Sequence, residues 1–322
     1  DVYKRQVEMM KEKGFAHMSE GALVVDVKED TDTKEIPPCI ILKSDGASLY
    51  STTDLATLVM RMKENNPDRV IYLADARQSM HFIQVFRCAR KTGIVPDTTE
   101  LVHIGFGTMN GKDGKPFKTR DGGVMRLEYL LKEIDDEMLN KIKENQKEKE
   151  NLNIDEAEAE QTAKTVALAA VKYGDLSNQA SKDYIFDIDR FTSFEGNTGP
   201  YILYTIVRIK SILSKYEAKG GDISALKDAI MPAVNAGQKN LMLSLAKFNA
   251  TIESAYEESA PHKICAYIYE LANAFNGFYH DTKILSEENE ELKKSYISLL
   301  VLTKEILEAC IDMLGFSAPD RM

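Results

Sequence analysis

The hydrophobic pattern of this chain changes once along its length, and that change limits the folds available to it. Up to about residue 110, apolar β-branched runs are separated by stretches with helical spacing; the runs are GALVVDV, CIILKS, RVIYLA and LVHIGF. Such alternation is typical of a parallel sheet with helical crossovers. Beyond a Gly- and Lys-rich loop the β-like runs nearly vanish, and long amphipathic helices follow from about residue 163. The sequence therefore predicts an α/β part followed by an all-α part packed as a helical bundle.

Two helices of the first part can be placed from their apolar residues. One starts near Ser51 and places Leu55, Leu58 and Met62 on one face. Another is expected over residues 79–91 and ends before a glycine, which suits the end of a helix. The stretch from Arg126 to Gln161 is dense in charge with a thin apolar stripe, which indicates one or two solvated helices.

Composition argues against several classes of protein. A net charge of -10 argues against non-specific coating of nucleic acid, so we expect no DNA partner. No run of about 18 apolar residues occurs and no leader-like segment opens the chain, which predicts a cytoplasmic protein without a membrane span. The cysteines form no C-x-x-C pair and the histidines lack metal-ligand spacing, so neither a bound metal nor a disulfide framework is expected.

The loop NGKDGKPFKTRDGG at residues 110–123 is the first candidate for chemistry. Flexible backbone N–H groups beside several Lys and Arg charges suit a polyphosphate. The G-x-x-x-x-G-K-[ST] spacing of a P-loop is absent, however, and most Gly-rich basic hairpins are solvated turns. Composition alone leaves both interpretations open.

Polar residues at helix and strand ends form a second candidate. Tyr50 and Asp54 are four residues apart at a helix start, and a carboxylate beside a hydroxyl matches the donors of a guanidinium. The plainer interpretation is that Asp54 offsets the helix dipole. Asp75, Gln78 and His81 follow the strand RVIYLA at its carboxyl end, where ligands bind in open α/β sheets.

A third candidate lies in the helical part. Tyr201 and Tyr204 share a helix with Arg208 and Lys210, after the turn EGNTGP. Aromatic rings beside cations can stack on unpaired bases. Aromatic residues three apart are more often part of a core, so this alternative stays open as well.

Six segments resemble class I arginyl-tRNA synthetases, in family order and across nearly the whole chain. They are residues 44–58, 69–86, 101–131, 172–213, 261–280 and the ending LGFSAPDRM. The resemblance implies the second half of a Rossmann-type catalytic domain followed by an anticodon-binding bundle. It suggests a division into a partial catalytic domain at 1–125, connecting helices at 126–185 and an α-helical anticodon-binding domain at 186–322.

The resemblance also implies roles for individual residues. Arginine would be bound by Tyr50, Asp54 and Gln78. The run KPFKTR would be a variant of the KMSKS motif, in which the catalytic lysines Lys115 and Lys118 stabilise the polyphosphate of ATP. The implied ATP-binding residues are Asp75, His81, Lys115 and Lys118. Mg²⁺ would accompany ATP.

The helical part would bind the anticodon loop of tRNA(Arg). Tyr201, Tyr204 and the C-terminal Met322 would pack on its bases, because stacking suits a single-stranded loop. The implied reaction is arginine–tRNA ligation in protein synthesis: ATP activates arginine to arginyl-adenylate, and the arginyl group passes to tRNA(Arg). A monomer is expected.

One departure from the family pattern is the missing HIGH motif. The segment HIGF at residues 103–106 lies only nine residues before Lys115 and is interpreted as the strand leading into the loop. We therefore expect a C-terminal portion that lacks the HIGH-containing half and forms no arginyl-adenylate alone. Half a sheet would also expose an apolar face and favour aggregation. The alternatives are a non-catalytic tRNA-binding module of the same family and an unrelated nucleotide-binding α/β protein.

Overall fold

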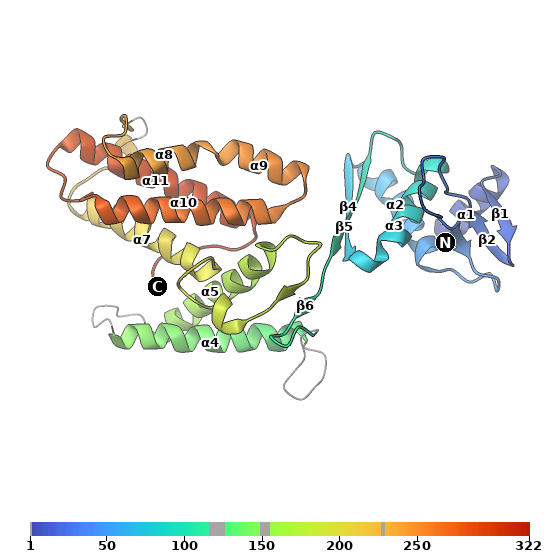
Figure 1. Cartoon of the computed structure of the whole chain (residues 1–322), viewed down its shortest axis with the longest axis horizontal. Helices are drawn as coiled ribbons and strands as arrows, with labels where there is room; N and C mark the ends of the chain where they lie inside the picture. Colours follow the sequence, from blue (N-terminus) through green and yellow to red (C-terminus); the bar gives the residue numbers. More distant parts are fainter. Residues whose placement is uncertain (1, 116–125, 149–154, 227–228) are drawn as a thin grey trace. The chain divides into compact units, whose positions relative to one another are not determined.

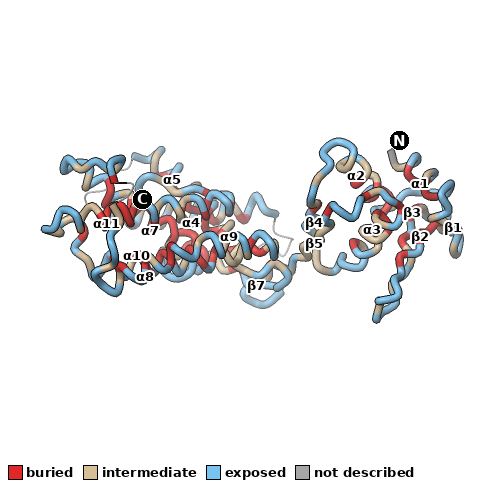
Figure 2. The backbone as a smooth tube through the Cα atoms, turned by 90° about the horizontal axis from the view of Figure 1, so that it is seen from above, coloured by how far each residue is buried: buried red, intermediate tan, exposed pale blue. Residues whose placement is uncertain are grey.

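The computed structural model describes all residues except 1, 116–125, 149–154 and 227–228. The chain forms two compact units, residues 1–107 and 108–322. Each unit has a hydrophobic core of its own, and Figures 1 and 2 show the elements and their buried stretches. None of the helices in the described ranges is both long enough and apolar enough to span a bilayer.

The first unit combines a short antiparallel sheet, a parallel strand pair and three α-helices. Its elements are α1 (Val2–Glu12), β1 (Ala16–Ser19), β2 (Ala22–Val25), β3 (Cys39–Leu42), α2 (Tyr50–Asn65), β4 (Arg69–Asp75), η1 (Ala76–Gln78), α3 (Ser79–Lys91) and β5 (Glu100–Phe106). The helix predicted over residues 79–91 is confirmed, and the helix predicted from Ser51 begins one residue earlier. Leu55 and Leu58 are fully buried on its inner face, as their spacing predicted.

The parallel pair is formed by β4 and β5, joined through α3. Their register runs without a break from Arg69 opposite Glu100 to Asp75 opposite Phe106. The run GALVVDV behaves differently, because β2 pairs antiparallel with β1 and β3. Only two residues separate β1 from β2, and so short a connection can form only a hairpin.

The start of α2 is fixed on β3 by two hydroxyl groups. Thr52 Oγ1 donates a hydrogen bond to the carbonyl of Ile41 at 2.7 Å, and the Ser51 hydroxyl donates to the carbonyl of Ile40. Both hydroxyl residues are buried. The start of α2, which carries Tyr50 and, one turn later, Asp54, therefore has a defined place in the unit.

The second unit is almost entirely helical. Its elements are β6 (Met109–Asn110), α4 (Leu127–Glu148), α5 (Glu156–Leu176), β7 (Tyr184–Ile185), α6 (Ile188–Phe191), α7 (Gly199–Ala218), η2 (Ser224–Leu226), α8 (Ala236–Ala246), α9 (Phe248–Glu257), α10 (Pro261–Asp281) and α11 (Glu290–Met313). One continuous core runs from α4 to the residues after α11. The predicted bundle is confirmed, and the long helices lie side by side in Figure 1.

The charged helix α4 buries the thin stripe that its sequence showed. Leu130, Ile134, Met138 and Ile142 recur every four residues and are all at most 4% exposed. They join the same core as the later helices, because α4 packs along α5. The compact units thus divide near residue 107, whereas the three-part division at 125 and 185 stays a prediction from the sequence.

All four cysteines are free and buried, two in each unit. Cys39 and Cys88 lie in the first unit, and Cys265 and Cys310 lie in the second. Burial raises the pKa of the Cys265 and Cys310 thiols to about 12. The pKa of Cys88 is raised by its hydrogen bond with Cys39 and by burial. The thiols of Cys88, Cys265 and Cys310 therefore stay protonated at neutral pH.

Candidate functional sites

The starts of α2 and α3 bring two predicted site residues into direct contact. His81 Nε2 lies 2.7 Å from Asp54 Oδ2, and both side chains are a little more than a quarter exposed. The sequence had assigned Asp54 to arginine and His81 to ATP. The hydrogen bond between them was not predicted.

Tyr50 and Gln78 lie at the ends of the same two helices. Tyr50 is the first residue of α2, one turn before Asp54, and its side chain is 85% exposed. Gln78 precedes α3 and is exposed too. Within the described ranges, neither side chain has a hydrogen-bond partner in the protein, so both can accept or donate to a ligand.

Asp75 ends β4 and caps the short helix η1. Its carboxylate accepts hydrogen bonds from the Arg77 backbone N–H at 2.8 Å and from the Arg77 guanidinium at 2.6 and 2.9 Å. The side-chain bond from Arg77 lowers the pKa of Asp75 to about 2. Asp75 is therefore ionised and occupied by its neighbour, and its ATP role stays a prediction.

The HIGF segment lies in β5, as predicted. His103 is opposite Tyr72 of β4, and its ring stacks on Phe82 with centroids 4.4 Å apart. Its Nε2 atom is buried and has no hydrogen-bond partner among the described residues. The packing of this ring against Phe82 is what a residue inside a strand of the core would show.

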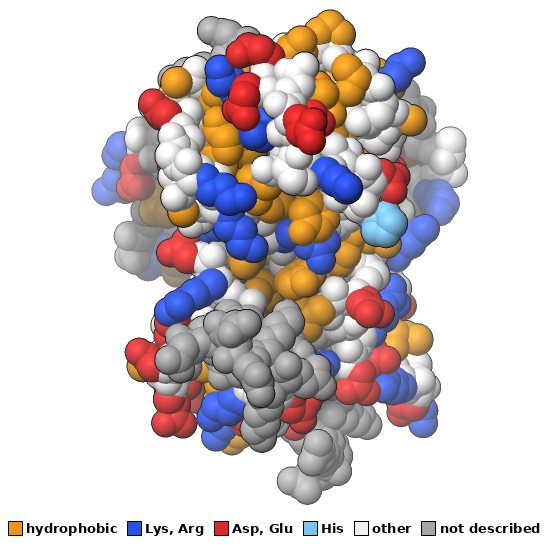
Figure 3. Space-filling model, turned by 90° about the vertical axis from the view of Figure 1, so that its left-hand side faces the viewer, with side chains coloured by type: hydrophobic (Ala, Val, Ile, Leu, Met, Phe, Trp, Pro, Cys, Tyr) orange, Lys and Arg blue, Asp and Glu red, His pale blue; other side chains and the backbone are white. Residues whose placement is uncertain are grey.

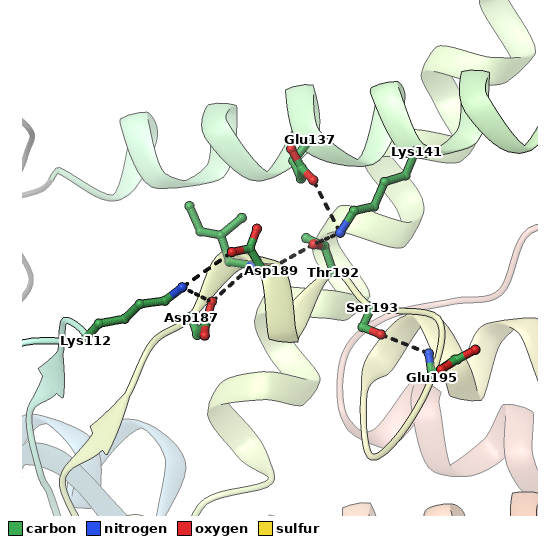
Figure 4. Close-up of polar contacts among 9 residues, drawn as sticks. Lys112, Glu137, Lys141, Asp187, Asp189, Thr192, Ser193 and Glu195 are labelled. Atoms are coloured by element: carbon green, nitrogen blue, oxygen red, sulfur yellow. Dashed lines mark hydrogen bonds and ion pairs between the residues drawn. The ribbon is translucent and has the colours of Figure 1, made fainter.

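The base of the Gly- and Lys-rich loop is fixed to the segment before α7. The backbone N–H and the hydroxyl of Thr108 both donate to Asp183 Oδ1, at 2.7 and 2.8 Å, and β6 pairs with β7. Lys112 Nζ lies 3.1 Å from Asp187 and 3.4 Å from Asp189, at the start of α6 (Figure 4). The hydrogen bond to Asp187 raises the pKa of Lys112. The stem of the loop is thus part of the helical unit.

Of the two predicted catalytic lysines, only Lys115 belongs to the part of the chain that the structure describes. Lys115 is exposed, and its backbone N–H donates to Asp113 Oδ1 at 3.1 Å. Lys118 lies outside the described residues. No group of three or more His, Cys, Asp or Glu side chains is arranged to hold a metal ion in the parts of the chain that the structure describes.

On the helical unit, Tyr201 belongs to a polar network that joins α7 to α10. Its hydroxyl donates to Asn273 Oδ1 at 2.6 Å and accepts from Asn276 Nδ2 at 2.9 Å. Its ring meets Tyr269 edge to face, with centroids 5.8 Å apart. Tyr201 is half-buried and also packs against the core, and its contact with RNA stays a prediction.

Arg208 extends the network into an aromatic and cationic surface. Its guanidinium donates to Asn276 Oδ1 at 2.6 Å and lies over the rings of Tyr204 and Tyr279, at 4.8 and 5.3 Å from their centroids. We call Tyr201, Tyr204, Arg208, Asn273, Asn276 and Tyr279 the α7–α10 surface. The sequence missed the three α10 residues, because nothing in their spacing shows that α10 packs on this side of α7.

Met322 is held apart from this surface. Lys210 binds the tail that leads to it, through Asp320 at 3.3 Å, and Arg321 forms a forked ion pair with Glu158 of α5. Met322 itself packs against the helical core. Lys210 is nine residues after Tyr201, or about two and a half turns, which places the tail on the opposite side of α7. The predicted RNA contact of Met322 is not tested by this arrangement.

Basic and acidic side chains are mixed on the surface of the helical unit. At the end shown in Figure 3, basic and acidic side chains alternate with hydrophobic ones. A 770 Å³ pocket beside η2 and the start of α11 is lined by Lys293 and Lys294, among others. Both lysines are already paired, with Glu290 at 2.7 Å and Glu291 at 3.0 Å, so we assign this pocket no ligand.

Comparison with known families matches almost the whole chain. Residues 1–188 match the catalytic domain of the family described as tRNA synthetases class I (R), and residues 202–322 match the DALR anticodon binding domain. The arginine–tRNA ligase of Alkaliphilus oremlandii is 54% identical over 98% of this chain, and that of Francisella tularensis is 43% identical over 96%. The chain spans about half the length of these curated relatives, 52% and 51%.

Solved structures give the same result for the fold. The arginyl-tRNA synthetase of Plasmodium falciparum superposes on the whole chain with a TM-score of 0.82 at 26% identity, and the chain covers 52% of it. The enzyme of Thermus thermophilus also gives 0.82, at 22% identity, with 58% of its length covered. The arrangement of helices and strands is thus shared.

Proposed function

The chain belongs to the class I arginyl-tRNA synthetase family, and from that premise we propose that its two units serve arginine–tRNA ligation. In this reaction ATP converts arginine to arginyl-adenylate, and the arginyl group is transferred to tRNA(Arg) in the cytoplasm. The observation that carries the proposal is the α7–α10 surface, where rings and a guanidinium occur together within the region matched by the anticodon-binding family.

Arginine would bind where α2 and α3 begin. The Asp54 carboxylate would accept from the guanidinium, with the Tyr50 hydroxyl and the Gln78 amide completing the set of polar partners. The exposure of Tyr50 and Gln78 supports this assignment, because both side chains are open to a ligand. A charge pairing with Asp54 would explain selection of a cationic side chain.

ATP is the second proposed ligand. Lys115 and Lys118 would place positive charge on the polyphosphate as the arginine carboxylate attacks the α-phosphate, and pyrophosphate would leave. Asp75 is the proposed third contact. Mg²⁺ would enter with ATP as part of the substrate.

tRNA(Arg) would bind through its anticodon loop. Unpaired bases could stack on Tyr204 and Tyr279, while Arg208 between them adds a cation to each ring. Met322 is proposed as a separate contact at the end of the tail. DNA and membranes are not proposed partners, and the protein is proposed to act as a monomer.

Because the chain spans half of its relatives, we propose that it forms no arginyl-adenylate alone. The second candidate is therefore a tRNA-binding module without catalysis. It is favoured for the isolated chain because every residue of the α7–α10 surface belongs to the helical unit. Arginine-dependent exchange of pyrophosphate into ATP distinguishes the two, since a purified chain that catalyses it contradicts the proposed inactivity.

The RNA assignment is tested by tRNA(Arg) binding to the purified chain. Tyr204→Ala and Tyr279→Ala are each expected to raise the Kd at least about fivefold, since stacking on one base contributes about 1–3 kcal/mol. Tyr256→Ala is the matched control, because this tyrosine is 68% exposed on α9, away from the α7–α10 surface. Unchanged affinity in folded variants would contradict the assignment, and so would equal affinity for a tRNA with a different anticodon loop. Loss of helicity in the variants would instead support a core role for these rings.

A further inference from the structure

The hydrogen bond between His81 and Asp54 connects two helices that the sequence keeps 27 residues apart. It is 2.7 Å long and joins Nε2 of the imidazole to Oδ2 of the carboxylate. Asp54 lies in the second turn of α2, and His81 lies in the first turn of α3. One oxygen of the carboxylate is therefore engaged from a neighbouring helix, and Oδ1 has no hydrogen-bond partner among the described residues.

The His81 ring is itself held in place. It meets Phe82 edge to face, with centroids 5.1 Å apart and planes at 76°. Phe82 is only 5% exposed and packs against Tyr72, Phe86 and His103 at centroid distances of 5.0, 5.7 and 4.4 Å. The imidazole is therefore backed by a packed aromatic cluster and has little freedom to turn away from Asp54.

We propose that His81 is a positioning residue of the arginine site, and that it acts through Asp54. In this role the imidazole donates its Nε2–H to Oδ2, which orients the carboxylate and leaves Oδ1 directed at the ligand guanidinium. This inference rests on the proposed function, since it requires that Asp54 binds arginine. It replaces the assignment of His81 to ATP that the sequence suggested.

The physical argument concerns preorganisation. An Asp side chain at a helix surface can adopt several χ1 and χ2 angles, and binding a planar guanidinium would have to select one of them. The hydrogen bond from His81 fixes the orientation of the carboxylate before the ligand arrives, so that binding need not select it. The imidazole is suited to this because its Nε2–H can donate to the carboxylate from a ring that packs against Phe82.

The test measures L-arginine binding to the purified chain by NMR titration, with L-citrulline as a neutral ligand of nearly the same shape. His81→Ala is expected to weaken arginine binding at least about tenfold, because the carboxylate loses its orientation. His81→Gln should restore most of the affinity, since the amide N–H can donate to Asp54. The His81 imidazole ¹⁵N signals should shift when arginine is added and stay in place with citrulline.

The chain offers a matched control in His17, which forms another His–Asp pair in the same unit. Its Nδ1 lies 3.8 Å from Asp26, and both side chains are more than half exposed. His17→Ala is expected to leave arginine binding unchanged. ATP binding, measured in the same samples, should not differ between the wild-type chain and either His81 variant.

Three results would overturn the inference. Arginine binding by His81→Ala at wild-type strength would remove the need for the imidazole. Equal weakening by His81→Ala and His81→Gln, with the amide spectrum of the unit intact, would show that an N–H donor at position 81 does not determine arginine affinity. A loss of ATP binding without a loss of arginine binding would return His81 to the nucleotide. If the wild-type chain does not prefer arginine to citrulline, the proposed arginine site is itself wrong, and this role is lost with it.

Discussion

At the scale of single residues, Arg87 shows how one side chain fixes a long connection in the first unit. Its two terminal nitrogens bind the two oxygens of Asp32 at 2.7 Å each. The nitrogen Nη1 also donates to the carbonyl of Val27 at 3.1 Å. The connection between β2 and β3 is thereby attached to α3. The hydrogen bonds from Arg87 lower the pKa of Asp32 to about 2, well below its ordinary value of 3.8.

This pair predicts a specific loss of stability in acid. A carboxylate with a lowered pKa contributes fully above its ordinary pKa, and the contribution disappears as the pH falls through the folded value. The free energy of unfolding should therefore decrease between about pH 4 and pH 2, and Asp32→Asn should reduce this decrease. Urea unfolding followed at several pH values measures it. Asp97→Asn, an exposed carboxylate, should leave the pH profile unchanged, and a profile equally unchanged by Asp32→Asn would contradict the argument.

The same scale shows what could be foreseen in the candidate sites. Tyr50 and Asp54 could be singled out as a candidate pair because a four-residue spacing on one helix is a local property. The contact of Asp54 with His81 depends on how two helices pack, and no spacing reveals it. Asn273 was missed for the same reason, since its partner Tyr201 lies 72 residues earlier.

At the scale of elements, the start of α7 is shaped by its approach to α5. The Thr198 hydroxyl accepts from the Tyr201 backbone N–H at 3.2 Å and donates to the carbonyl of Ser193 at 2.6 Å. The next residue, Gly199, lies so close to α5 that an added Cβ would be 2.3 Å from the carbonyl oxygen of Ala169. The helix that carries Tyr201 therefore begins directly on the backbone of its neighbour.

Gly199→Ala is expected to destabilise the chain by about 1–3 kcal/mol, because the backbone of α5 cannot move aside as a side chain could. Gly277→Ala supplies the matched control within α10, where an added Cβ meets nothing within 4 Å. That substitution should stabilise the helix by up to about 1 kcal/mol. Thermal unfolding of both variants measures the difference. Effects of the same sign at the two glycines would argue against the close approach.

The sequence predicted elements well where apolar residues kept one regular spacing over many residues. The helix over residues 79–91 and the helical bundle belong to this group. The hairpin of β1 and β2 was not predicted, because strand direction depends on the length of a connection rather than on apolar alternation. The placement of α4 in the main core also escaped prediction, since its charged surface hides a stripe only one residue wide.

At the scale of the whole molecule, the parallel pair β4–β5 has two unlike faces. Val70 and Tyr72 face the packed interior, whereas Ile71, Leu73 and Phe106 are 46%, 72% and 45% exposed. Parallel sheets are ordinarily covered on both faces. The exposed apolar face that was expected from the sequence is thus present, and it gives the chain a surface suited to self-association.

Leu73→Glu is expected to reduce self-association, because it places a charge in the centre of this face. Light scattering at increasing protein concentration would show it as a smaller rise in apparent mass. Met18→Glu is the control, since Met18 is 65% exposed on β1 of the same unit but lies outside the β4–β5 face. If both variants associate as the wild-type chain does, another surface is responsible.

The placement of the cysteines has a practical consequence for kinetics. Each unit buries two thiols, and a thiol reagent reaches them only when the surrounding core opens. Modification of Cys39 and Cys88 therefore times the opening of the first unit, and modification of Cys265 and Cys310 times that of the second. The two modification rates therefore report separately on the local opening of each core, and both can be measured in one sample.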